Sequence, residues 1–150
     1  MHHPSLFTPL KLGRHTLRNR IVLPPLTRQR AAQPGDVPTD HAAVYYRQRA
    51  SAGFMVSEGT QIEPRGQGYA WTPAIYSEEQ IAGWRQVTDA AHAEGGVIFA
   101  QLWHVGRVSH TAAARRRSTG RTVSNSGAEG QGFYPDGRER RHAGGTVGAA

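Results

Sequence analysis

The sequence predicts an α/β protein that corresponds to the N-terminal part of a (β/α)8 TIM barrel, preceded by a hairpin. Three observations predict this class. Short apolar runs without alternation begin near Ile21, Phe54 and Val97, as in strands of a parallel sheet. Apolar residues at helical spacing fill the segments between them. Long polar loops follow the strands, whereas the helix-to-strand connections are tight.

The segment from Leu6 to Arg20 is expected to form a small hairpin, since turn-forming residues interrupt its short apolar stretches at positions 9, 13 and 19. The run from Ile21 to Leu23 then predicts a first strand, buried on both faces and ended by Pro24 and Pro25. A helix is expected from about Asp40. Thr39 can cap this helix, and its apolar stripe (Ala43, Tyr46 and Ala50) ends at Gly53.

The second strand is expected over residues 54–56, followed by a polar and glycine-rich loop from Ser57 to Tyr76. Ser77 with Gln80 fits a capping box for a second helix. The apolar stripe of that helix runs through Ile81, Trp84, Val87 and Ala91 and ends at Gly95. Residues 97–102 supply a third strand. The order hairpin, strand, helix, strand, helix, strand predicts a parallel sheet.

The spacing of the strands alone leaves a barrel and an open doubly wound sheet as alternatives. The turn after the first strand reads Pro24-Pro25-Leu26-Thr27-Arg28, which has neither a dinucleotide-binding G-x-G-x-x-G nor a phosphate loop. A barrel is therefore favoured. Because an eight-stranded barrel occupies about 250 residues, three strands within 110 residues predict an incomplete one.

Residues 111–150 are expected to form an irregular tail, rich in arginine and glycine, in which the strand and helix pattern is lost. Its alternation of unlike stretches is typical of a frameshifted coding sequence. The formal net charge is +7, and the tail carries 7 arginines against 3 acids. A nucleic-acid-binding protein using this tail is one alternative, and a truncated product without activity is another. Because 17 of the 18 basic residues are arginine, a bias that codon composition can impose, nucleic acid is the less favoured partner.

Other functional classes have little support in the sequence. There is no cysteine, no charged-then-apolar leader and no apolar run long enough for a membrane span, so a cytoplasmic protein without a membrane partner is expected. No metal site is predicted, because the histidines at 41, 92, 104, 110 and 142 fit no zinc spacing. Glu58 is interpreted as half of a structural ion pair rather than a general base.

Four stretches at or after the predicted strand ends carry a family resemblance. They are NRIVLPPLTR (19–28), SEGTQIEPRGQGYAWTPAIYS (57–77), GW (83–84) and AQLWHVGRVSH (100–110). Together they resemble the Old Yellow Enzyme family of FMN-dependent alkene reductases, over residues 6–110 in unbroken order. The string QLWHVGR after a strand is distinctive of that family.

The resemblance implies a set of cofactor-binding residues: Pro25, Leu26, Thr27, Gly59 and Gln101. Pro25 and Leu26 match backbone that flanks the flavin ring, and Thr27 matches a hydroxyl that donates toward the flavin C4 carbonyl. Gly59 matches a position where the backbone approaches the flavin. Gln101 matches an amide that pairs with the pyrimidine edge of the ring. A glutamine inside an apolar strand is also expected to be buried and to need a partner.

Tyr69 and Trp103 match residues that line the substrate pocket, although core packing is the commoner role of an aromatic residue. The implied reaction passes hydride from NADPH or NADH through FMN to an activated alkene such as an enone. The family's catalytic groups (a His/His or His/Asn pair, a tyrosine and an arginine) belong to later strands, so no catalytic residue is assigned here and the 150-residue chain is expected to be inactive. The sequence does not predict the physiological alkene or the oligomeric state.

Overall fold

The computed structural model describes residues 3–109. A 3-10 turn, η1 (Pro4–Phe7), precedes a hairpin of β1 (Leu10–Leu12) and β2 (His15–Leu17). Three strands and two helices then alternate: β3 (Val22–Leu23), α1 (Asp40–Arg47), β4 (Phe54–Gln61), α2 (Glu78–Ala93) and β5 (Ile98–Trp103). Two further 3-10 turns are η2 (Pro64–Gly66) and η3 (Gly106–Val108). The expected order of elements is confirmed.

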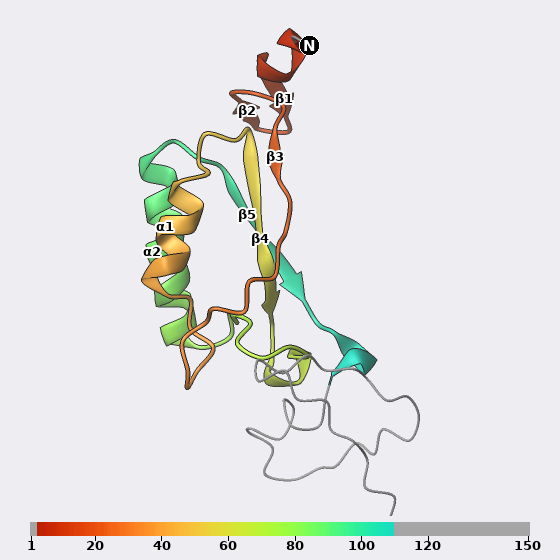
Figure 1. Ribbon diagram of the computed structural model, residues 1–150, viewed down its shortest axis with the longest axis vertical. Coiled ribbons are helices and arrows are strands. Elements are labelled where there is room, and N and C mark those ends of the chain that lie inside the picture. Colours follow the sequence, from red (N-terminus) through yellow and green to blue (C-terminus); the bar gives the residue numbers. More distant parts are fainter. Residues whose placement is uncertain (1–2, 110–150) are drawn as a thin grey trace, which may run out of the picture.

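The hairpin and the main sheet are separate. β1 and β2 pair antiparallel, whereas β3, β4 and β5 form a parallel sheet in that order. The hairpin lies beyond the end at which the three parallel strands begin, and the strands run from it toward the opposite end (Figure 1). Because β4 lies between β3 and β5, the described part of the chain contains the first two β-α-β units of a barrel.

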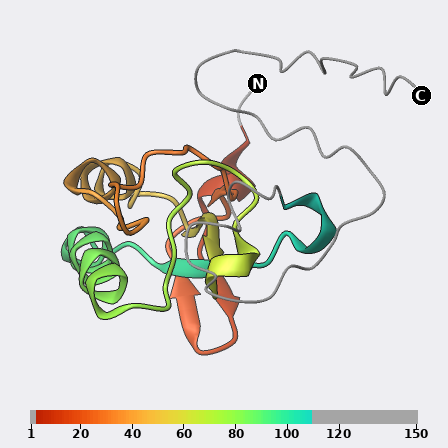
Figure 2. The same ribbon diagram turned by 90° about the horizontal axis from the view of Figure 1, so that it is seen from below.

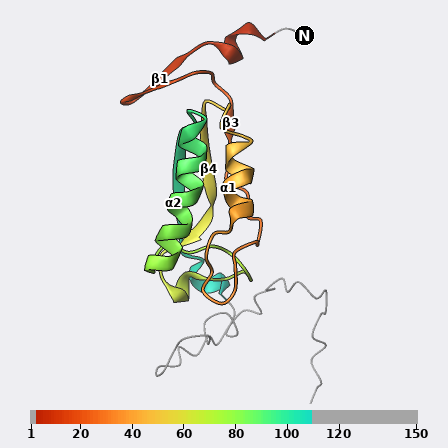
Figure 3. The ribbon, with the colours of Figure 1, turned by 90° about the vertical axis from the view of Figure 1, so that its left-hand side faces the viewer.

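Both helices lie side by side on one side of the parallel sheet, as Figures 2 and 3 show from two directions. The core is the cluster between the helices and the sheet: Ala42, Tyr46, Ala50, Met55, Trp84, Val87 and Ala91. Its members come from α1, the turn after it, β4 and α2, as the helical spacing of the apolar residues predicted. This core holds β4 against the helices, and β4 carries the centre of the candidate site.

The two helices begin differently. Ser77 forms the predicted capping box with Gln80, and α2 continues to Ala93. Thr39 is the N-cap of α1 but its side chain makes no capping hydrogen bond; its hydroxyl lies 3.5 Å from the carbonyl oxygen of Arg30 instead. α1 ends at Arg47, before the predicted limit at Gly53, and turns cover the residues between.

Two expectations about the strands are wrong. The first strand is not buried on both faces: Ile21 and Val22 are about two-fifths exposed, because β3 is an edge of the sheet. The second strand is longer than the apolar run 54–56, since β4 continues through Gln61. Its polar residues Ser57, Glu58, Thr60 and Gln61 are all buried. They remain in a strand because side chains and backbone of neighbouring segments satisfy their hydrogen bonds.

The expectations for the tail at 111–150 and for His110 and His142 lie outside the described residues. Within residues 3–109, neither helix has the length and apolar character that crossing a bilayer requires.

Candidate functional site

A β-bulge in β4 sets the geometry of the candidate site. The pairing of β4 with β5 shifts between Val56 and Gly59, after which Gly59 lies opposite Gln101. The backbone N–H of Gln101 donates to the Ser57 hydroxyl at 3.0 Å. Ser57 thus joins the two strands at the bulge, where two of the predicted cofactor-binding residues, Gly59 and Gln101, are direct neighbours.

Gly59 is required by the close approach of an aromatic ring. A Cβ atom at this position would lie 2.1 Å from Cε3 of Trp103, so any larger residue would displace the indole. The Trp103 ring in turn stacks on Tyr69, with 5.6 Å between ring centroids and 25° between their planes. The two predicted substrate-pocket residues therefore contact each other, although Tyr69 lies in a loop far from β5 in the sequence.

Thr27 lies beside these aromatic rings. Thr27, Gln29, Tyr69 and Trp103 together line an open hollow of about 400 Å³. The predicted flavin contact of Thr27 and both predicted pocket residues thus belong to one concave surface. Gln29 adopts a left-handed backbone conformation (φ 56°), which is uncommon outside glycine and recurs at functional sites.

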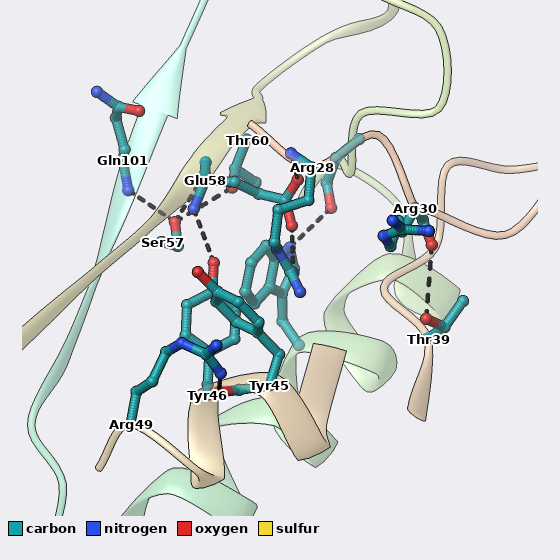
Figure 4. A network of polar contacts seen from close by, with 12 residues as sticks. Arg28, Arg30, Thr39, Tyr45, Tyr46, Arg49, Ser57, Glu58, Thr60 and Gln101 are labelled. Carbon is teal, nitrogen blue, oxygen red and sulfur yellow. Dashed lines mark hydrogen bonds and ion pairs between the residues drawn. The ribbon is translucent and has the colours of Figure 1, made fainter. Parts of the chain in front are cut away.

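An ion pair joins the loop after β3 to β4, and Figure 4 shows it from close by. The Arg28 guanidinium pairs with the Glu58 carboxylate, and the Arg28 backbone N–H donates to the same carboxylate at 3.1 Å. Glu58 is only 3% exposed and the Arg28 side chain 12%. The prediction that Glu58 belongs to an ion pair is confirmed.

Tyr46 of α1 completes this network from below the strand. The backbone N–H of Glu58 donates to the Tyr46 hydroxyl oxygen at 2.8 Å, and the Arg28 guanidinium lies 5.0 Å from the Tyr46 ring centre. The guanidinium also lies 4.0 Å from the ring of Tyr45. Burial raises the pKa of Tyr46 from 10.0 to about 12, since the phenolate would be desolvated there.

The remaining predicted cofactor residues are exposed. Pro25 and Leu26 are exposed after β3, and neither lines the hollow. The expectation that Gln101 is buried is wrong: its side chain is exposed, because β5 is an edge strand. Its amide therefore needs no protein partner.

The donor set fits a flavin ring. Within residues 3–109, neither the Thr27 hydroxyl nor the Gln101 side-chain amide hydrogen-bonds to another protein atom, so both are available to a ligand. A hydroxyl donor and an amide with both donor and acceptor match the alternating polar atoms at the pyrimidine edge of a flavin. Their roles toward FMN stay predictions.

Three contributors were missed from sequence. Arg28 was given no role, although an arginine directly after Thr27 and a glutamate at the end of the next strand indicate an ion pair. Ser57 was assigned to a loop because its polar neighbours resembled one. The role of Gln29 could not be predicted, since a glutamine in the sequence does not indicate a left-handed backbone conformation.

Other clusters do not contribute a site. His104 bonds Glu63 through Nε2 at 3.0 Å and accepts from the Gly106 N–H, so it is a hydrogen-bonded histidine, as interpreted. The hydrogen bond from Arg65, followed by that from His104, lowers the pKa of Glu63. A larger hollow of about 670 Å³, beside α1, contains none of the predicted site residues. Among residues 3–109, no three His, Asp or Glu side chains gather as metal ligands would.

Comparison with known proteins places this geometry in a family. The family model described as the NADH:flavin oxidoreductase / NADH oxidase family matches residues 5–137. Among curated proteins, 12-oxophytodienoate reductase 2 of Arabidopsis thaliana is 48% identical over 113 residues, and 12-oxophytodienoate reductase 1 of Oryza sativa subsp. japonica is 51% identical over 107 residues. These alignments cover 75% and 71% of this chain, and 30% and 28% of the relatives.

Solved structures agree. Morphinone reductase in complex with tetrahydroNAD matches with a TM-score of 0.70 and 52% identity, over 74% of this chain and 30% of that one. The old yellow enzyme homologue from Zymomonas mobilis matches with a TM-score of 0.71 and 48% identity, over 74% and 31%. The chain spans about 30% of the length of the relatives it matches. The strands of this chain correspond to the first strands of the barrel in those proteins. The chain belongs to the NADH:flavin oxidoreductase / NADH oxidase family, and within it to the Old Yellow Enzymes.

Proposed function

We propose that this chain supplies the first strands of an FMN-dependent oxidoreductase that passes hydride from NADPH or NADH through FMN to an activated alkene. One observation carries the proposal. The predicted flavin residues Gly59 and Gln101 are direct neighbours across β4 and β5, while Thr27 shares a hollow with the predicted pocket residues Tyr69 and Trp103. Residues from three strand ends thus meet at one place, the usual position of a barrel active site.

The residues have distinct roles in this proposal. The Thr27 hydroxyl and the Gln101 side-chain amide would donate hydrogen bonds to polar atoms at the edge of the flavin ring. Donation to an oxygen that gains electron density on reduction favours the reduced state. Pro25 and Leu26 would lie along the ring, and Gly59 would keep the backbone close to it. FMN, when bound, supplies the hydride transfer that no amino-acid side chain provides.

The substrate class follows from the hollow and from the relatives. Tyr69 and Trp103 provide stacked aromatic surface of the kind that binds a flat, apolar molecule. The relatives are by name reductases of 12-oxophytodienoate and of morphinone, both carbonyl compounds. An alkene conjugated to a carbonyl, such as an enone, fits both observations. Because NAD(P)H is regenerated inside cells, we place the reaction in the cytoplasm.

The groups that hold the substrate carbonyl and donate the proton are not assigned within residues 3–109. The described residues contribute one wall of the site, whose flavin-facing groups are largely exposed. We therefore propose that the 150-residue chain alone is not a competent reductase.

A chimera tests the proposal. Residues 5–109 would replace the matching segment of morphinone reductase, to which this chain is 52% identical. The purified chimera should be yellow, hold FMN in stoichiometric amount and oxidise NADH with cyclohexenone. Unmodified morphinone reductase is the positive control. A folded chimera that holds no FMN would show that these residues do not form a flavin site.

A further inference from the structure

The Arg28–Glu58 pair lies between two predicted flavin contacts. Arg28 directly follows Thr27, and Glu58 directly precedes Gly59. The Glu58 carboxylate accepts both the Arg28 guanidinium and the Arg28 backbone N–H. Because the backbone of Arg28 is bonded as well as its side chain, the pair fixes the position of the chain next to Thr27, not only the position of a side chain.

Every polar group of Glu58 has a partner. Its N–H donates to the Tyr46 hydroxyl oxygen, and its carbonyl oxygen accepts from the hydroxyls of Ser57 and Thr60, both at 2.9 Å. The Arg28 guanidinium stacks against the rings of Tyr45 and Tyr46. The contacts anchor the loop after β3 to α1 and β4 together, and within residues 3–109 the one buried side-chain atom of the pair without a hydrogen-bond partner is Arg28 Nε.

Stability alone does not account for a buried ion pair. Removing two charges from water costs free energy that their attraction often fails to exceed, so apolar residues of similar size would serve the fold equally well. A pair that also hydrogen-bonds to the backbone beside a ligand site can fix the position of the residues that contact the ligand. Such positioning matters because a contact misplaced by about 1 Å can slow a reaction about 100-fold.

We propose that Arg28 and Glu58 are positioning residues for the flavin site: the pair holds Thr27 at a fixed place relative to Gly59, and so sets the hydrogen bond that tunes the flavin. This rests on the proposed function. Neither residue touches the flavin in this proposal. Their effect passes through the backbone of Thr27 on one side and of Gly59 on the other.

Hydrogen–deuterium exchange of the 150-residue chain tests the anchoring without any cofactor. Glu58→Ala should speed exchange in residues 26–29 by about tenfold or more, because the Arg28 amide loses its acceptor, while residues 84–91 of α2 keep their rate. If Glu58→Ala unfolds the chain, Glu58→Gln, which retains an acceptor oxygen, should show a smaller rise in the same segment. Glu63→Ala, at an exposed ion pair, is the matched control and should leave residues 26–29 unchanged. Unchanged exchange there in folded Glu58 variants would overturn the proposal.

The chimera tests the effect on the flavin. Glu58→Gln should shift the reduction potential of bound FMN and slow its reduction by NADH several-fold, by no more than the loss of the Thr27 hydroxyl itself, because the pair acts by placing that hydrogen bond. Glu63→Gln should change neither. Glu58 variants that lose stability or FMN content but keep the parent's potential and rate would show a purely structural pair. If the parent chimera holds no FMN, the proposed function fails, while the exchange experiment still decides whether the pair anchors Thr27.

Discussion

β4 and β5 are paired neighbours with opposite surroundings. β4 reads FMVSEGTQ and all but two of its residues are buried, whereas β5 reads IFAQLW and none of its residues is. The more apolar strand is thus the more exposed one. β4 lies at the centre of the parallel sheet and β5 at its edge, so position, rather than hydrophobicity, decides burial. In this chain the predicted flavin and pocket residues of β5, Gln101 and Trp103, thus lie on an exposed edge strand.

The largest effect of this difference should be on cofactor binding. The 150-residue chain should hold FMN orders of magnitude more weakly than the chimera, because Gln101 and Thr27 are exposed and no anchor for the phosphate is predicted within residues 3–109. Retained flavin after gel filtration and NADPH oxidation with cyclohexenone measure this. Stoichiometric yellow protein with turnover would contradict the prediction and show that chains assemble into a working site.

Truncation of one side chain in each strand sharpens the comparison. Met55 of β4 is fully buried, so Met55→Ala should lower the free energy of unfolding by about 2–5 kcal/mol, from lost burial and the cavity that remains. Leu102 of β5 is 65% exposed, and Leu102→Ala should change that free energy by no more than about 0.5 kcal/mol. Urea unfolding of both variants measures the two values. Equal losses would mean that β5 is covered in solution, for example by another chain.

High pH should lower the free energy of unfolding through Tyr46, the buried tyrosine of the Arg28–Glu58 network. The folded-state pKa of Tyr46 is about 12, against 10.0 for an ordinary tyrosine, so the neutral form is favoured by folding. The stabilisation is complete below pH 10 and is lost as the pH rises from 10 through 12, by about 2–3 kcal/mol in total. Unfolding free energies at pH 9 and 11.5 measure the loss. Tyr46→Phe is the control: it should show a smaller pH dependence, and an undiminished slope would assign the effect to another group.

The same contrast explains what the sequence predicted and what it did not. The order of elements followed from apolar spacing and from the capping box of Ser77 and Gln80, which are local signals. The extent of β4 did not, since Ser57, Glu58 and Thr60 look like a loop until their partners on other segments are known. The burial of Gln101 was wrongly predicted because it was inferred from the apolar residues beside it in the sequence, which do not show that β5 is an edge strand.

The candidate site was predicted unevenly for the same reason. Family strings identified Thr27, Gly59, Tyr69 and Trp103, and the structure brings Thr27 and both aromatic residues to one hollow and places Trp103 against Gly59. The contact between the Trp103 ring and Gly59, and the role of Arg28, depend on distances between strands. Such distances are properties of the folded chain and have no local sequence signal.

The smallest effect should come from Thr27, which is exposed beside the buried Arg28–Glu58 pair. In the chimera, Thr27→Ala should slow flavin reduction by NADH several-fold, since one hydrogen bond contributes about 1 kcal/mol net and favours the reduced ring. Stability should not change, because the hydroxyl has no partner within residues 3–109. Stopped-flow reduction and the flavin potential measure the first effect, and thermal unfolding measures the second. Thr27→Ser retains the hydroxyl and should behave as the parent. An unchanged flavin potential in Thr27→Ala would show that Thr27 does not contact the flavin. A loss of stability would show instead that Thr27 contributes to the buried network of β4.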